Sequence, residues 1–205
     1  MVAATTGNLA PEKYTNREVG VKWDITTALA FTGALYQLDR ENARFAQANG
    51  TFVQTGKSQV EGYELTLTGY LTKDWQVSAG YGHQVGELTS ATSPVLVAGT
   101  PLPLLPRETY SLWTRYQFDR NWGAGVGIVR QTEKIAALQP AGNQVLLPAF
   151  TTVDAALFYK FSDNLKMQLN VTNLFNEKYI VSADNNDNLT PGAPTTVILA
   201  VTSKF

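Results

Sequence analysis

The segment Leu165-Lys166-Met167-Gln168-Leu169-Asn170-Val171-Thr172 alternates apolar and polar residues without interruption. A period of two places the apolar side chains on one face of a β-strand and the polar ones on the other. The same alternation recurs between Val153 and Phe161 and again from Thr196 to Lys204. We therefore expect strands with one apolar and one polar face to make up most of the chain.

The same test, applied along the whole chain, predicts about nine strands. They lie at 14–24, 26–40, 55–71, 75–86, 107–118, 122–132, 150–161, 165–174 and 195–205. Strands of soluble proteins are most often about five or six residues long, whereas a strand that crosses a bilayer needs about nine to eleven. Since most of the predicted strands have ten residues or more, the lengths favour an all-β, antiparallel, membrane-spanning sheet.

The connections between these strands fall into two alternating kinds. The tight turns, rich in Asp and Asn, lie at 24–25, 72–74, 119–121 and 162–164. The long loops lie at 41–54, 87–106, 133–148 and 175–194. Short turns at one end and long loops at the other are typical of bacterial outer-membrane barrels.

Large aromatic residues recur at the tight-turn ends of the predicted strands. They are Trp23, Trp75, Phe118, Trp122 and Phe161. Outer-membrane barrels carry such rows of aromatic residues at the membrane–water interfaces. We expect these five residues to form a membrane-interface girdle. Phe205, the last residue, lies at the same end.

Charged residues also follow the alternation. The face opposite the apolar one carries Glu18, Lys22, Glu64, Arg115, Asp154, Lys160, Lys166 and Lys204. A Lys or Arg that faces lipid at mid-membrane costs about 2–4 kcal/mol, so this face is expected to line a lumen. Glu61 and Arg130 fall on the apolar face near the long-loop ends, where that cost is small. The glycines of Gly123-Ala124-Gly125-Val126-Gly127 fall on the lumenal face and are expected to leave room for a plug or a solute.

Composition excludes several other classes of protein. The net charge of −1 does not suit a nucleic-acid binder, and the absence of cysteine rules out disulfides and thiolate metal sites. No apolar run approaches the length of a transmembrane helix. The single histidine, His83, is not accompanied by a nucleophile-elbow motif. We expect no catalytic residue, no cofactor and no metal held by protein side chains.

Four stretches of the sequence, taken in order, resemble the barrel of TonB-dependent outer-membrane receptors of the ferric-siderophore type. They are Leu9-Ala10-Pro11-Glu12 with Glu18-Val19-Gly20-Val21-Lys22, Gly62-Tyr63-Glu64 between Gly56 and Gly69, Leu102-Pro103-Leu104-Leu105-Pro106-Arg107 with Leu112-Trp113, and Leu169-Asn170-Val171-Thr172-Asn173-Leu174-Phe175-Asn176-Glu177-Lys178-Tyr179. The last is similar to the family's LNVxNLFxxxY signature before its final strand.

This resemblance implies that residues 1–205 are the C-terminal part of a 22-stranded barrel. The family's signal peptide, TonB box and plug domain have no counterpart in the sequence. The implied function is uptake of a ferric siderophore across the outer membrane of a Gram-negative bacterium, with iron held by the siderophore. The implied partners are the ferric siderophore, the lipid bilayer, the barrel-assembly machinery acting on Phe205 and, through the missing N-terminal part, TonB.

Ligand-binding groups are expected in the long external loops. The candidates are Arg44, Phe45, Gln47, Arg130, Gln131, Lys134 and Tyr179. Cationic and aromatic side chains suit an anionic, aromatic catecholate complex.

Two alternatives remain open at this point. The first is a small autonomous porin-like barrel, which predicts an even number of strands and a signal peptide. The second is a soluble β-barrel or sandwich that binds a ligand, which predicts shorter strands and an apolar interior. Because a nine-stranded sheet has two unpaired edges, we further expect that the isolated chain does not insert as a stable monomer.

Overall fold

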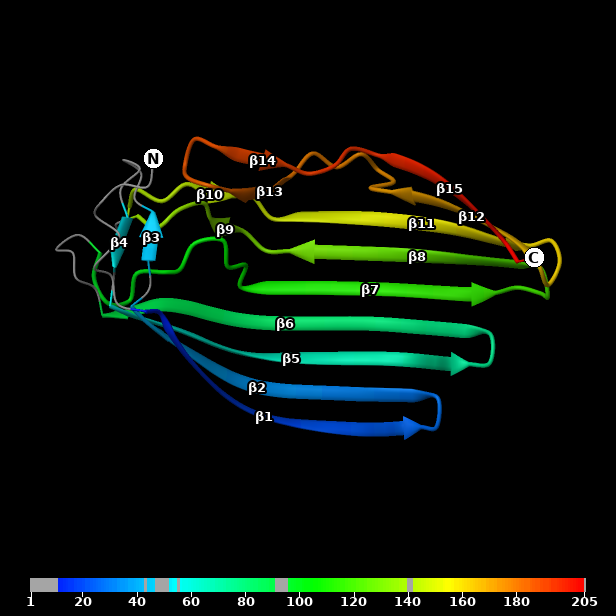
Figure 1. Ribbon diagram of the computed structural model, residues 1–205, viewed down its shortest axis with the longest axis horizontal. Helices are drawn as coiled ribbons and strands as arrows, with labels where there is room; N and C mark the ends of the chain where they lie inside the picture. Colours follow the sequence, from blue (N-terminus) through cyan, green and yellow to red (C-terminus); the bar gives the residue numbers. More distant parts are fainter. Residues whose placement is uncertain are drawn as a thin grey trace.

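The computed structural model describes residues 11–42, 44–46, 52–54, 56–90, 96–139 and 142–204, and at 44–46 and 52–54 it describes the backbone. Its main feature is one nine-stranded antiparallel sheet whose strands lie side by side in chain order (Figure 1). The strands are β1 (Lys13–Thr26), β2 (Leu29–Glu41), β5 (Lys57–Thr72), β6 (Trp75–Ser90), β7 (Glu108–Gln117), β8 (Trp122–Gln131), β11 (Phe150–Lys160), β12 (Leu165–Thr172) and β15 (Thr196–Ser203). Each corresponds to one of the nine expected strands, so the all-β fold class is confirmed.

The two ends of the sheet differ as the connection lengths predict. Tight turns join the strands at one end, and the long loops lie together at the other (Figure 1). The loops contain three short ladders that were expected to be irregular. These are β3 (Arg44–Ala46) with β4 (Phe52–Gln54), β9 (Lys134–Ile135) with β10 (Leu146–Leu147), and β13 (Ile180–Ala183) with β14 (Leu189–Pro191). Segments of two to four residues are too short to show a period in the sequence.

The largest differences from the predicted strand boundaries lie at the first tight turn and at the end of β6. The first tight turn lies at 27–28 and not at 24–25, because β1 continues through an irregularity between Asp24 and Thr26. The Thr26 hydroxyl then accepts a hydrogen bond from the backbone N–H of Ala28. Strand β6 also runs on to Ser90, and Glu87 forms a bridge with Pro101 inside the segment expected to be a loop.

The two faces of the sheet have opposite chemistry. One face, called here the outward face, exposes large apolar side chains, with Val19 67% and Val197 62% exposed. The register places Lys160 and Lys166 on the other face, called here the lumenal face, together with Arg115. An apolar face this exposed is costly in water and favourable against lipid.

Most buried apolar residues of the described chain lie in the loops or at the loop ends of strands, whereas Val77 and Ala156 lie within the sheet. One cluster joins Leu88, Leu96 and Leu138, with Leu102 packed against it. A second joins Ala136, Leu147 and Ala183, with Ile180 packed against it. The second, third and fourth long loops are thereby packed against one another. The core of the described structure is therefore a cap of loops at one end of the strands.

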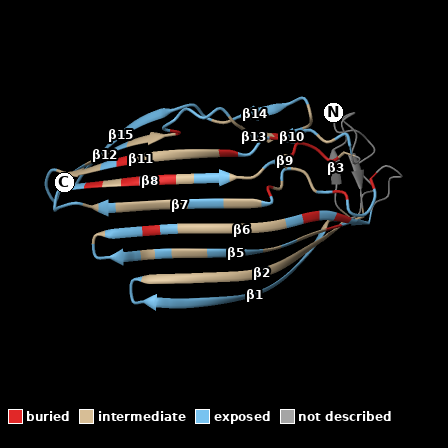
Figure 2. Cartoon of the chain, turned by 180° about the vertical axis from the view of Figure 1, so that it is seen from behind, coloured by how far each residue is buried: buried red, intermediate tan, exposed pale blue. Residues whose placement is uncertain are grey.

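The edge strands are the most exposed elements of the sheet. Every residue of β1 and of β15 is exposed, and the described strands do not close the sheet by pairing β1 with β15 (Figure 2). Unpaired backbone groups cost several kcal/mol each in lipid. Both edges therefore require further strands or water.

The lumenal glycines of β8 do not leave open space, contrary to the expectation. A Cβ placed on Gly125 would lie 2.8 Å from the Trp113 ring, and one on Gly127 would lie 2.9 Å from the same ring. Trp113 is the register partner of Gly127 on β7. The glycines thus make room for the Trp113 indole on the lumenal face of the sheet. The sequence analysis did not predict this contact.

Candidate functional site

Three of the ligand-binding candidates, Gln131, Lys134 and Tyr179, lie at the loop cap. Lys134 begins β9, and its ammonium donates hydrogen bonds to the Gln131 side-chain oxygen at 3.2 Å and to the Val181 carbonyl at 2.9 Å. Burial lowers the pKa of Lys134 below its usual value. Two of the predicted residues, Gln131 and Lys134, are therefore in direct contact, and Lys134 ties the third long loop to the fourth.

Tyr179 lies close to this pair. Its ring stacks on Phe150 with centroids 4.4 Å apart, and Phe150 is the register partner of Gln131. Gly192 lies directly against the Tyr179 ring, where a Cβ would overlap it. Phe150 of β11 and Gly192 of the fourth loop thus both pack against Tyr179. Gln131, Lys134 and Tyr179 form one neighbourhood around Phe150.

Arg130 is not part of that neighbourhood. It lies on the outward face at the loop end of β8, opposite Tyr110, and its guanidinium donates to the Thr151 hydroxyl at 3.1 Å. Of the first-loop candidates, Arg44 and Phe45 form part of the backbone of β3, and Gln47 lies outside the described residues. Phe205 also lies outside them.

Two hollows flank Ala149 at the loop end. One, of about 420 Å³, is lined by Tyr179 and by the segment Asn176–Lys178. The other, of about 630 Å³, is lined by Lys134 together with Arg107 and Glu133. Both volumes lie in the usual range of about 300–1,000 Å³ for small-molecule sites. Arg107 belonged to a recognised motif, and its place beside Lys134 was not predicted because the two lie on different loops.

The predicted aromatic row is present at the tight-turn end. Its members are strongly exposed on the outward face: Trp23, Phe118 and Phe161 at 60%, Trp75 and Trp122 at 42%. Two tyrosines that the sequence reading missed complete the row. Tyr116 lies between Trp75 and Phe118, with centroids at 6.3 and 5.4 Å, and Tyr159 lies between Trp122 and Phe161, at 4.3 and 4.9 Å. The period of two could have found both, since they share the outward parity.

A second aromatic group lies on the outward face toward the loops. Tyr81 lies 5.8 Å from Tyr63 and 4.8 Å from Tyr110, and His83 stacks on Tyr63 at 5.2 Å. The sequence predicted no catalytic role for His83. In the structure its Nδ1 lies 3.7 Å from a Glu108 carboxylate oxygen, still on the outward face.

Two searches of the described residues returned nothing. No group of three or more His, Cys, Asp or Glu residues is placed to hold a metal ion. No helix in the described ranges is long and apolar enough to span a membrane.

Comparison with known protein families places residues 2–174 in the TonB-dependent receptor-like β-barrel family. The chain belongs to this family. Its members are outer-membrane proteins of Gram-negative bacteria. The assignment agrees with the strand lengths, with the tight turns at one end of the sheet and the long loops at the other, and with the apolar outward face.

The chain is 33% identical to the catecholate siderophore receptor Fiu of Escherichia coli, over 99% of this chain and 27% of the receptor. It is 28% identical to PiuA of Acinetobacter baumannii, described as a probable TonB-dependent siderophore receptor, over 28% of that protein. The crystal structure of the closed form of Fiu superposes on 99% of this chain with a TM-score of 0.82 and 30% identity, and covers 29% of the receptor chain. The chain thus spans a little more than a quarter of the length of these relatives.

The comparisons do not favour either alternative. The family model and the receptors match the chain as part of a large receptor barrel.

Proposed function

We propose that this chain forms the C-terminal part of the barrel wall of an outer-membrane receptor that takes up a ferric catecholate siderophore. The observation that carries the proposal is the match to a catecholate siderophore receptor over 99% of the chain. The apolar outward face supports contact with lipid, and the packed loop cap supports binding on the outside of the cell.

The ligand is proposed to bind at the loop cap beside Lys134, Tyr179 and Arg107. A ferric catecholate complex is anionic and aromatic, so it would gain from a cation and from a ring held in place by packing. Iron would be held by the siderophore, as cargo and not as a resident cofactor. TonB would act through parts of the receptor outside this chain, and the barrel-assembly machinery would read the C-terminal segment.

Iron transport in intact cells tests the proposal. The gene is deleted at its own locus, and iron-starved cells are given the radioactive ferric complex of 2,3-dihydroxybenzoate, a simple catecholate. Energised uptake should fall in the deletion strain and return on complementation, and an uncoupler should abolish it while binding at the surface persists. Uptake of ferric citrate is the control and should not change. Catecholate uptake that is equal in wild type and deletion would contradict the proposal.

A further inference from the structure

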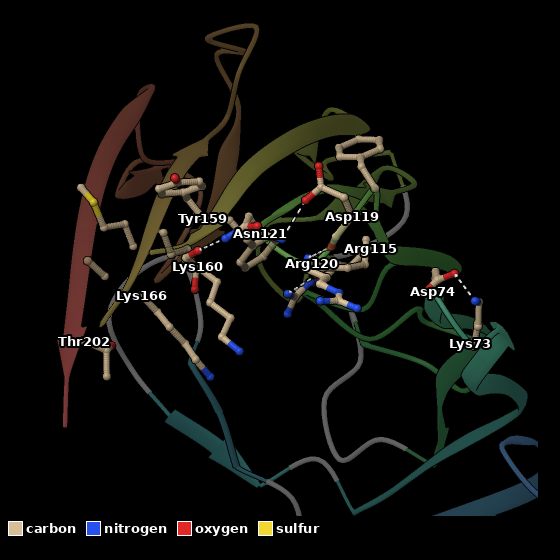
Figure 3. A pocket seen from close by; sticks show the side chains of 16 residues that line it. Lys73, Asp74, Arg115, Asp119, Arg120, Asn121, Tyr159, Lys160, Lys166 and Thr202 are labelled. Carbon is tan, nitrogen blue, oxygen red and sulfur yellow. Dashed lines mark hydrogen bonds and ion pairs between the residues drawn. The ribbon is translucent and has the colours of Figure 1, made fainter. Parts of the chain in front are cut away.

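One cation that the sequence assigned to the ligand lies outside both the loop cap and the barrel interior. Lys160 and Lys166 point into the lumenal hollow at the tight-turn end (Figure 3), whereas Arg130 lies on the outward face at the loop end of β8. Paired strands flank β8 on both sides, so the exposure of Arg130 does not depend on what lies beyond the edges of the sheet. Because the outward face of this outer-membrane protein is apolar, a partner for Arg130 is sought among membrane lipids.

The depth of Arg130 in the membrane follows from its distance to the aromatic row. Trp122 belongs to that row, and Arg130 lies eight residues further along the same strand and on the same face. Eight residues span about 26 Å along a strand, and a strand tilt of about 40° reduces this to a height of roughly 20 Å. The apolar band of outer-membrane barrels is about 25 Å tall, and their long loops are extracellular. Arg130 therefore lies at the level of the outer-leaflet headgroups.

The guanidinium of Arg130 is oriented but not neutralised. Its Nη1 donates to the Thr151 hydroxyl at 3.1 Å, and no carboxylate of the described residues lies within 4 Å of it. Its Nε and Nη2 are therefore free to donate a pair of parallel hydrogen bonds, the geometry in which arginine binds phosphate. Arg17, another outward cation near the loop ends, differs because it is already paired with Asp39 at 2.6 Å.

The acidic group nearest along the neighbouring strand is engaged elsewhere. Glu108 lies two residues before Tyr110, which is the register partner of Arg130 on β7. One Glu108 carboxylate oxygen accepts from the Tyr110 hydroxyl at 2.7 Å, and the other lies 3.7 Å from His83 Nδ1 on β6, the strand on the far side of β7. Glu108 thus leaves the outer side of Arg130 open to an anion.

Toward the tight turns, the outward face beside Arg130 is apolar. Ile128 and Val126 follow on β8, and the register places Leu112 and Val153 on either side of Ile128. Acyl chains gain from contact with such a surface, as does any apolar group removed from water. A cation directly above an apolar column therefore matches a lipid that carries a phosphate above its acyl chains.

We propose that Arg130 forms the headgroup contact of a binding site for a phosphorylated glycolipid of the outer leaflet. The phosphate accepts two hydrogen bonds from the guanidinium, Thr151 fixes the orientation of that group, and the acyl chains pack on Ile128 and Val126. Tyr110 lies beside the headgroup, the usual place of tyrosine in a membrane protein. A lipid fits better than free phosphate because the apolar column lies directly below the cation. The site is separate from the loop cap and goes beyond the proposed function.

The test uses the complete receptor, purified in detergent and freed of bound lipid. Two probes are compared in mixed micelles: lipid A with both of its phosphates, and the same lipid A with the phosphates removed. The variant is Arg130→Gln, and Arg130→Lys keeps the charge without the planar fork. The matched control is Arg17→Gln, which removes an outward cation already bonded to Asp39. The resistance of each receptor to heat in SDS is recorded as a measure of folding.

Wild type should bind phosphorylated lipid A about five- to ten-fold more tightly than the dephosphorylated form, the size of one partly exposed charge-assisted contact. Arg130→Gln should lose this preference, Arg130→Lys should keep part of it, and Arg17→Gln should match wild type. Ile128→Ser should weaken the binding of both lipids.

Unchanged preference in a heat-resistant Arg130→Gln receptor overturns the proposal. Equal binding of the two lipids by wild type also overturns it, and this comparison decides even if the variant does not fold. Displacement of phosphorylated lipid A by millimolar inorganic phosphate would show a site for the free anion and would overturn the assignment to a lipid.

Discussion

The Asp154 carboxylate accepts a hydrogen bond from the backbone N–H of Asn173 at 2.8 Å, which links the loop end of β11 to the end of β12. The Asn173 side chain, only 4% exposed, then donates to the carbonyls of Glu177 and Ala193 and accepts from the Glu177 N–H. Its backbone φ of 48° is one that asparagine tolerates better than most residues. Asn173, within the family signature, therefore links the end of β12 to both the start and the end of the fourth long loop.

Replacement of Asn173 should make the fourth long loop less tightly held. Asn173→Ala leaves two carbonyls and one N–H without their partner, and the folded state should lose roughly 2–4 kcal/mol. Protease cleavage within 175–194 should become faster, and the heat-resistant form in SDS should convert at a lower temperature. Asn143→Ala, at an exposed position without hydrogen-bond partners in the described structure, should change neither. Equal behaviour of the two variants would show that the Asn173 hydrogen bonds are unimportant.

The contact of Trp113 with the β8 glycines predicts a contrast between two Gly→Ala changes. Gly125→Ala forces a methyl group against the indole and should destabilise the wall by about 1–3 kcal/mol. Gly82→Ala, on β6 with nothing within 4 Å of its new Cβ, should be neutral or slightly stabilising. The midpoint of urea unfolding in detergent measures both. Similar losses at both sites would mean that loss of glycine in a strand, and not the tryptophan, is responsible.

Lys134 is expected to act as a tether between loops before it acts on a ligand. Lys134→Met removes both hydrogen bonds, so protease should cut the fourth loop faster and catecholate binding should weaken by about three-fold or less. Lys22→Met, which removes an exposed ammonium on β1 away from the loop end and without a side-chain partner in the described structure, serves as the control. A ten-fold loss of binding with unchanged protease sensitivity would instead make Lys134 a direct ligand contact.

Fluorescence quenching of two tryptophans tests which face of the sheet contacts lipid. Trp122 lies in the outward row, whereas Trp113 lies on the lumenal face. In the complete receptor in lipid vesicles, with each tryptophan isolated in turn by Trp→Phe changes, lipids brominated near the headgroup should quench Trp122 and leave Trp113 unaffected. Stronger quenching of Trp113 would invert the assignment of the two faces.

Asp119 should make the β7–β8 turn sensitive to acid. Hydrogen bonds from the backbone N–H groups of Asn121 and Trp122 hold its pKa below its ordinary value of 3.8. A lowered carboxyl pKa adds stability that is fully present above about pH 4 and is lost as the pH falls through the folded value. Asp119→Asn keeps the acceptor oxygen and removes the titration. The difference in urea midpoint between wild type and this variant should therefore shrink from pH 6 to pH 3, and a constant difference would contradict the assignment.

The nine long strands, the outward parity and the aromatic row were predictable from the sequence because a period of two is a local property. The alternation within each strand shows which residues lie on its apolar face, as in Leu165 to Thr172. The tight turns at 72–74, 119–121 and 162–164 were predictable for the same reason, since Asp and Asn form them locally. The first turn was misplaced because the bulge after Asp24 adds a residue that no period reveals.

Tertiary structure alone decided what lies between strands and between loops. The register between neighbouring strands places Lys160 opposite Lys166 and packs the Trp113 ring against Gly125. The packing of Leu88 with Leu138 and the bond from Lys134 to Val181 join segments about fifty residues apart. Such contacts form only when the sheet brings the loop ends together, so no local pattern in the sequence encodes them.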